Sequence, residues 1–201
     1  SGTGTGAFTL AALLTLTSQI QLPSTGDYDG DGDPDVYGTS PTGQDILLQN
    51  DGAWQFTDIP IPTGPFSNGG VLADVDGDGD GDIVSSHRIW LQTAPKSFAP
   101  AVAIPGATPE TMGALDFDGD GDVDLFGRTT GAIWLNSGSG SFTLATGSLG
   151  TAGSWTGDFD RDGDVDAVSP SFVVSENRIR QLDVTATLRP GGVAGFTVRG
   201  A

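Results

Sequence analysis

A nine-residue acidic phrase that occurs four times constrains this chain more than any other feature. The copies are DYDGDGDPD at 27–35, DVDGDGDGD at 74–82, DFDGDGDVD at 116–124 and DFDRDGDVD at 158–166, so their starts lie 47, 42 and 42 residues apart. A period of this length is typical of proteins in which each repeat forms one four-stranded sheet. Many glycines and prolines, 32 and 12, suit tight turns better than helices. The sequence therefore predicts an all-β repeat fold.

The segments between the phrases indicate where the strands lie. A short β-type run starts at the last aspartate of each phrase, and the strand that enters the next phrase would complete each sheet. A second run is expected to begin at Ile46, Ile89, Ile133 and, more loosely, Ile179. A third, aromatic strand is expected near Phe56, Phe98 and Phe142.

The two ends of the chain do not complete a repeat. The apolar stretch 7–16 is too short to span a bilayer, so no membrane span is expected. We interpret 7–14 as an outer strand, because Phe8 falls in the aromatic register. If this strand completes the last repeat of the same chain, the product is a closed ring. If it completes the last repeat of a neighbouring copy, the copies associate head to tail and can form a filament. The third alternative is that the chain is a fragment of a larger propeller. We divide the chain into repeats at 1–182 and a β-type tail at 183–201, a linker or a donated strand.

The chemistry of the phrase indicates a hard cation. Carboxylates stand at positions one, three, five, seven and nine, and the glycine at position six permits a sharp turn. Oxygen ligands without histidine or cysteine select calcium over zinc or copper. A solvated turn explains one copy but not four in register, and an EF-hand would need a glutamate at position twelve and flanking helices, which are missing here. The predicted metal residues are Asp27, Asp29, Asp31, Asp33, Asp35, Asp74, Asp76, Asp78, Asp80, Asp82, Asp116, Asp118, Asp120, Asp122, Asp124, Asp158, Asp160, Asp162, Asp164 and Asp166.

About four calcium ions are thus expected, one for each loop. Without a cation, the carboxylates of each loop would repel one another, so metal binding and folding should be coupled. We expect an affinity on the order of 0.1 to 1 mM, which suits the outside of the cell.

The phrase, followed by an apolar strand, resembles the FG-GAP/VCBS repeat family, which includes the calcium-binding blades of integrin α-chain propellers. The similarity covers about residues 7–182. It implies β-propeller-type blades of four antiparallel strands, with calcium in the loop between the first two strands. Positions one, three, five and nine would bind through side chains and position seven through its carbonyl. Arg161 departs from the glycine at position four of the other loops and is expected to reduce affinity there. Four loops are fewer than the blades of an ordinary propeller of this family, so ring closure stays open.

The charge and the remaining residues limit the function. The 26 acidic and 8 basic residues give a net charge of −18, which argues against a nucleic-acid partner. His87 is the only histidine and has no nucleophile motif around it, so no catalytic residue and no enzyme activity are predicted. Trp90 and Trp134 occupy equivalent places and are expected to pack between sheets, whereas Trp54 and Trp155 remain candidate surface contacts.

We therefore expect a secreted or cell-surface, calcium-stabilised structural or adhesive module that contacts a protein, a glycan or copies of itself. The alternative is a non-catalytic accessory domain of a secreted carbohydrate-active or lipid-cleaving enzyme. A calcium buffer is a weaker alternative, because a buffer does not need tryptophan-bearing sheets.

Overall fold

The computed structural model describes residues 19–52, 55–61, 68–149, 155–157, 159–161, 165–168, 174–175, 182–188 and 194–200. Throughout these ranges the regular structure is β-strand, as predicted. The described residues include no helix long and apolar enough to cross a membrane. The predicted strand at 7–14 and the side chains of Trp54 and Trp155 lie outside the described part.

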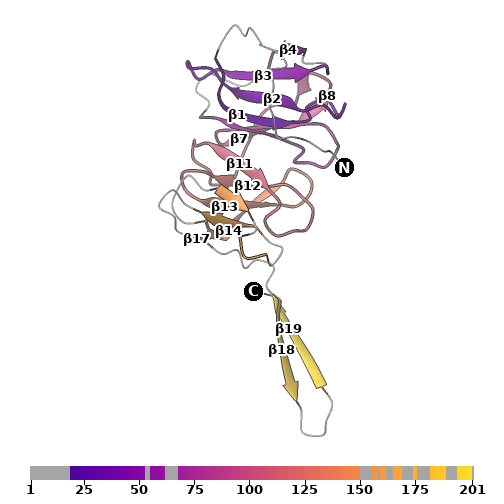
Figure 1. The fold of residues 1–201 in the computed structure, drawn as a ribbon, viewed down its shortest axis with the longest axis vertical. Coiled ribbons are helices and arrows are strands. Elements are labelled where there is room, and N and C mark those ends of the chain that lie inside the picture. The colour runs from indigo at the N-terminus through magenta and orange to yellow at the C-terminus, as the bar shows by residue number, and fades with distance from the viewer. Residues whose placement is uncertain are drawn as a thin grey trace, which may run out of the picture.

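The strands form four successive antiparallel sheets, which we call blades 1 to 4 (Figure 1). Blade 1 contains β1 (Gln21–Gly26), β2 (Asp35–Thr39), β3 (Asp45–Asn50) and β4 (Phe56–Ile59). Blade 2 contains β5 (Gly70–Ala73), β6 (Asp82–Ser85), β7 (Arg88–Trp90) and β10 (Val102–Ala103). Blade 3 contains β11 (Met112–Leu115), β12 (Asp124–Gly127), β13 (Ala132–Asn136) and β14 (Phe142–Ser148). Blade 4 contains β15 (Trp155–Gly157), β16 (Asp166–Val168) and β17 (Val174–Ser175).

Each acidic phrase is the loop of a hairpin between the first two strands of its blade. The residue before the phrase pairs with the ninth residue in all four blades, as Gly26↔Asp35, Ala73↔Asp82, Leu115↔Asp124 and Gly157↔Asp166. The strand that enters a phrase therefore begins that phrase's own blade and does not close the preceding one. This corrects the predicted grouping, because pairing across a nine-residue loop is the most local contact open to that strand.

The aromatic strand expected near Phe98 is present but interrupted. Phe98 lies in β9 (Ser97–Phe98), which pairs with β8 (Gln92–Ala94), Ala99 N donates to Leu91 O at 2.8 Å, and β10 then pairs with β7 at the outer edge of blade 2. One other strand prediction needs correction. In blade 4 the strand beside β16 is β17, with the pair Val168↔Val174, so the second strand of this blade precedes Ile179 in the sequence. Ile179 itself lies outside the described residues.

The blades pack face to face, and β1 contacts β5 while β5 contacts β11. Blades 1 and 4 lie at opposite ends of the stack in Figure 1. Among the described strands, none pairs blade 1 with blade 4. Ring closure and strand exchange through 7–14 both stay predictions.

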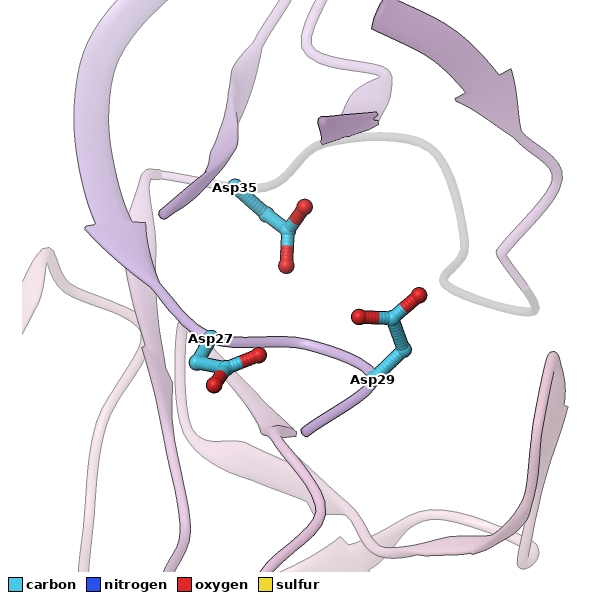
Figure 2. A group of neighbouring side chains, drawn as sticks. All are labelled: Asp27, Asp29 and Asp35. Atoms are coloured by element: carbon cyan, nitrogen blue, oxygen red, sulfur yellow. The ribbon is translucent and has the colours of Figure 1, made fainter. Parts of the chain in front are cut away.

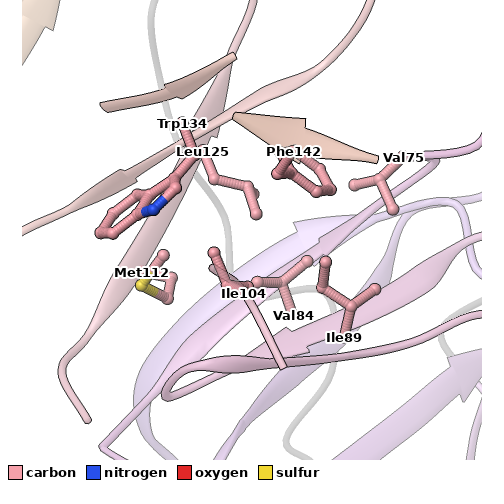
Figure 3. Close-up of a cluster of buried hydrophobic side chains, with 8 residues drawn as sticks. All are labelled: Val75, Val84, Ile89, Ile104, Met112, Leu125, Trp134 and Phe142. Atoms are coloured by element: carbon pink, nitrogen blue, oxygen red, sulfur yellow. The ribbon is translucent and has the colours of Figure 1, made fainter. Parts of the chain in front are cut away.

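Apolar clusters fill the spaces between consecutive blades. The cluster between blades 1 and 2 contains Tyr28, Tyr37, Leu47, Ile59, Leu72, Ile83 and Trp90. The cluster between blades 2 and 3 contains Val75, Val84, Ile89, Ile104, Met112, Leu125, Trp134 and Phe142 (Figure 3). The cluster between blades 3 and 4 contains Phe117, Phe126, Ile133, Leu149 and Ala167. Trp90 and Trp134 are buried here, as predicted.

The second residue of an acidic phrase belongs to each of these clusters. Tyr28, Val75 and Phe117 are all at most 1% exposed. Burying one such side chain stabilises the fold by about 1.5 to 3 kcal/mol. The first three loops are therefore anchored in the cores that join each blade to the next, whereas Phe159, at the same position of the fourth loop, is 52% exposed.

The segment predicted as a β-type tail contains β18 (Leu182–Leu188) and β19 (Ala194–Gly200). They form a hairpin in register from Leu182↔Gly200 to Leu188↔Ala194. Figure 1 shows this hairpin extending away from the blades. Its assignment as a linker or a donated strand stays a prediction.

Candidate metal centres

The first carboxylate of each described loop organises the turn. In the first loop, Gly30 N donates to Asp27 Oδ1 and Gly32 N to Asp27 Oδ2, both at 2.9 Å. The second and third loops repeat both bonds. The chain wraps around this carboxylate only because the residues at positions four and six have positive φ, 74° at Gly30 and 88° at Gly32.

The ninth carboxylate lies at the base of the hairpin, where the two strands begin to pair, and is fully buried in blades 1 to 3. In blade 2, Asp82 Oδ2 accepts a hydrogen bond from Val75 N at 2.9 Å and Oδ1 accepts one from Gln92 N at 2.8 Å. Asp35 and Asp124 accept the equivalent pairs of bonds. This residue therefore ties the start of the loop to the strands of the blade.

Three carboxylates converge in each of the first three loops. The grouped residues, whose ligand oxygens lie within 4.8 Å of one another, are Asp27 with Asp29 and Asp35, Asp74 with Asp76 and Asp78, and Asp116 with Asp118 and Asp124. Figure 2 shows the first group, in which the three carboxylates face a common space. Positions one and three belong to every group, and either position nine or position five completes it.

The first group fits a calcium ion. Asp29 Oδ2 accepts a hydrogen bond from Gln49 Nε2, but Asp29 Oδ1 is buried and has no hydrogen-bond partner among the described residues. A buried carboxylate oxygen without a partner carries a desolvation cost that a cation would remove. An all-oxygen set of this kind matches the ligand preference of calcium.

Burial sets the electrostatics of these loops. Desolvation raises the pKa of Asp82 to about 7, against the lowering effect of the N–H groups of Gln92 and Val75, and nearby Asp76 and Asp78 raise it further. Desolvation likewise raises the pKa of Asp35 and Asp124. A bound cation would favour the ionised form of these groups, so protons and metal compete for the loops.

The repeats can now be compared with known proteins. A sequence model of the FG-GAP-like repeat matches residues 27–85 and 116–169, which contain all four acidic loops. The chain belongs to this family. A comparison with curated protein sequences gives no significant match.

Among solved structures, the chain is similar to a lectin from Agrocybe aegerita, described as specifically recognising non-reducing terminal N-acetylglucosamine. The TM-score is 0.50 at 18% sequence identity, and the likeness covers 72% of this chain. The chain spans 44% of that lectin's length. At this identity the similarity shows a shared propeller-type fold.

The fourth FG-GAP-like loop is only partly described. Asp166 is buried, and its Oδ2 accepts a hydrogen bond from Phe159 N at 3.1 Å, as position nine does in the other loops. Asp160 is exposed, and Arg161 at position four has a φ of 68°. Asp158, Asp162 and Asp164 lie outside the described residues.

Several predicted residues stay outside the three groups. Asp31 and Asp120 stand at position five, Asp82 at position nine, and Asp33, Asp80 and Asp122 at position seven. Position seven was predicted to bind through its carbonyl, and that role stays a prediction. In all three described loops its N–H donates to the carboxylate at position five, from Asp33 to Asp31 at 2.8 Å, for example.

Sequence reasoning missed the amide side chains that meet these FG-GAP-like loops. Gln49 binds Asp29, while Gln92 and Asn136 bind loop carbonyls of the preceding blade. The one available signal was an amide residue near the end of the second β-type run in each of the first three repeats.

A polar cavity of about 450 Å³ lies at the other end of the inner strands. Its walls come from blades 1 to 3 and include Gln21, Thr39, Asn68, Thr111 and Thr129. The one carboxylate in its wall, Glu110, accepts hydrogen bonds from Thr129 N, Thr130 N and Thr130 Oγ1 at 2.7 to 3.0 Å. Apart from Glu110, the polar side chains of the wall are neutral hydroxyls and amides.

The surroundings of His87 contain no arrangement typical of catalysis. Its Nδ1 lies 3.4 Å from Ser86 Oγ, and no hydrogen bond joins its ring to a carboxylate in the described part of the chain. The FG-GAP-like repeats indicate a binding or structural module.

Proposed function

We propose that this chain is a calcium-stabilised module, secreted or displayed outside the cell, that binds a glycan or protein surface. The observation that carries the calcium assignment is the buried, unpartnered Oδ1 of Asp29 within a group of three converging carboxylates. Calcium would neutralise the repulsion within each group and hold the loops that anchor the inter-blade cores.

Calcium binding is tested by calorimetric titration of chelator-treated protein and by counting bound metal after dialysis. We expect about four ions per chain, a higher melting temperature in calcium than in chelator, and a much weaker effect of magnesium. Identical melting curves in calcium and in chelator would refute the calcium assignment.

A glycan is the ligand that the cavity favours. Its volume lies in the usual range of small-molecule sites. Neutral hydroxyls and amides suit the hydroxyl groups of a sugar, and the protein of similar fold is a lectin for terminal N-acetylglucosamine. The proposal holds equally for a free-standing adhesive module and for an accessory domain of a secreted enzyme.

Glycan binding is tested by a glycan array that includes terminal N-acetylglucosamine, followed by titration of each sugar that binds. Asn68→Ala should weaken a sugar held in the cavity at least tenfold, because its exposed amide lies in the wall. Gln55→Ala, an exposed change in blade 1 away from the cavity, is the matched control. Equal affinity of both variants would place the glycan elsewhere.

A further inference from the structure

An amide side chain stands at the same structural position in blades 1, 2 and 3. Asn50, Gln92 and Asn136 each donate their backbone N–H to Oδ1 of the ninth carboxylate of their own loop, at 2.6, 2.8 and 2.7 Å. These residues therefore hold the carboxylate that closes the metal loop of their blade.

The side chains of two of these residues cross to the preceding blade. Gln92 Nε2 donates to Tyr28 O at 2.8 Å, and Asn136 Nδ2 donates to Val75 O at 2.7 Å. Tyr28 and Val75 are the second residues of the preceding loops. Asn50 instead donates within its own blade, to Pro34 O at 3.2 Å.

The hydrogen bonds form one continuous chain across three metal loops. Tyr28 N binds Asp35 in the first loop, and Tyr28 O receives the Gln92 side chain, whose backbone holds Asp82 in the second loop. Val75 N then binds Asp82, and Val75 O receives the Asn136 side chain, whose backbone holds Asp124 in the third loop.

Every member of this chain is buried, from Asp35 at 0% to Asn136 at 7% exposure. Water therefore does not compete for these hydrogen bonds. If one peptide shifts, water cannot replace the hydrogen bond that it loses. A cation that fixes the first and third carboxylates of one loop, which belong to all three groups, fixes the peptide at position two between them. The carbonyl oxygen of that peptide is then held in one position, where it accepts the hydrogen bond from the side-chain amide of the next blade.

We propose that Gln92 and Asn136 are positioning residues that couple neighbouring calcium loops, so that filling one loop raises the affinity of the loop in the next blade. The ordering of the second loop is partly complete once the first is filled, and this is the source of positive cooperativity. Electrostatic repulsion between bound ions would instead lower the affinity of the loop in the next blade, which is negative cooperativity. The inference rests on the proposed calcium occupancy.

The test uses the full chain and loop-specific NMR signals. The amides of Gly79 and Gly121 donate to the first carboxylates of the second and third loops, so each reports the ordering of its own loop during a calcium titration. Asp29→Asn weakens the first loop, and Asp58→Asn removes the same charge from an exposed site on β4. Each change is made in the wild-type chain and in Gln92→Met, which keeps the side-chain length but removes the donor.

In the wild-type background, Asp29→Asn should raise the calcium midpoint at Gly79 roughly fivefold, within the common range of coupling factors, while Asp58→Asn leaves it unchanged. In the Gln92→Met background, Asp29→Asn should shift Gly79 much less, because only the backbone bond from Gly81 N of the second loop to Tyr28 O then joins the two loops. The fold should tolerate this change, because Tyr28 O keeps its bond from Gly81 N at 3.1 Å. Asn136→Leu provides a second test, with Asp76→Asn weakening the second loop and Gly121 as the reporter.

An unchanged midpoint at Gly79 in Asp29→Asn would overturn the coupling without touching calcium binding itself. A shift of undiminished size in Gln92→Met would also overturn it, because the coupling would then follow another path. Loop amides that do not respond to calcium at all would overturn both the proposed function and this inference.

Discussion

The side-chain amide of Gln92 donates a hydrogen bond of 2.8 Å to the backbone carbonyl of Tyr28, 64 residues earlier in the sequence. The bond joins the second blade to the metal loop of the first. Loop geometry and blade stacking are therefore parts of one structure, and changes in a loop should affect the stability of the neighbouring blade.

Asp124→Asn should destabilise the chain by about 1 to 3 kcal/mol, because a buried amide cannot accept both backbone N–H bonds that the carboxylate now accepts. These bonds come from Phe117 N and Asn136 N at 2.8 and 2.7 Å. Chemical denaturation in calcium measures the loss. Asp122→Asn, at position seven of the same loop, should cost much less. Equal losses would show that burial of the ninth carboxylate has no special role.

Acidity should stabilise the calcium-free protein. The pKa of Asp82 is raised from 3.8 to about 7, so between these values the folded chain holds a proton that the unfolded chain has lost. The corresponding stability is fully present below about pH 4 and is lost as the pH rises through about 7. Melting temperatures in chelator should therefore fall over this range, and Asp82→Asn should flatten the slope. A melting temperature that rises from pH 4 to 7 in chelator would contradict this.

Gly121→Ala should cost about 1 to 2 kcal/mol, because a φ of 100° is unfavourable for a residue with a Cβ atom. No atom lies within 4 Å of the added carbon, so the loss would come from the backbone alone. Gly157→Ala is the control, since its added carbon meets Phe159 at ordinary contact distances of 3.6 to 3.9 Å. Denaturation midpoints in calcium compare the two, and similar midpoints would argue against the backbone explanation.

Arg161→Gly should stabilise the chain by about 1 kcal/mol and strengthen calcium binding to the fourth loop. Arg161 has a φ of 68° at the position where the other three loops have glycine with φ between 68° and 78°. Calorimetric titration and thermal melting of the variant measure both effects. An unchanged affinity together with a lower melting temperature would show that the arginine side chain contributes more than its backbone costs.

Self-association through terminal strands is a prediction that the sequence raised and the structure leaves open. Blade 4 has three strands in the described part of the chain, whereas blades 1 to 3 each have four. If residues 7–14 pair with a neighbouring copy, light scattering in calcium should detect assemblies that disappear when residues 1–14 are removed. Removing 183–201 tests whether the hairpin contributes. Monomers in the full chain and in both truncated chains would rule out strand exchange.

The sequence alone determined the four loops, their flanking strands and the all-β class. These features are local: the carboxylates of a loop lie within nine residues, and the turn depends on glycines such as Gly32 with a φ of 88°. Spacing therefore carried enough information to identify the loop and to predict its metal ligands.

The tertiary structure decided which strand closes each blade and which side chains join the blades. Val174 takes the place beside Val168 that Ile179 was expected to occupy. The choice of partner strand depends on turn length and chain reversal, which the periodicity of apolar residues does not encode. The bond between Gln92 and Tyr28 depends on packing between residues 64 positions apart, so no local pattern could show it.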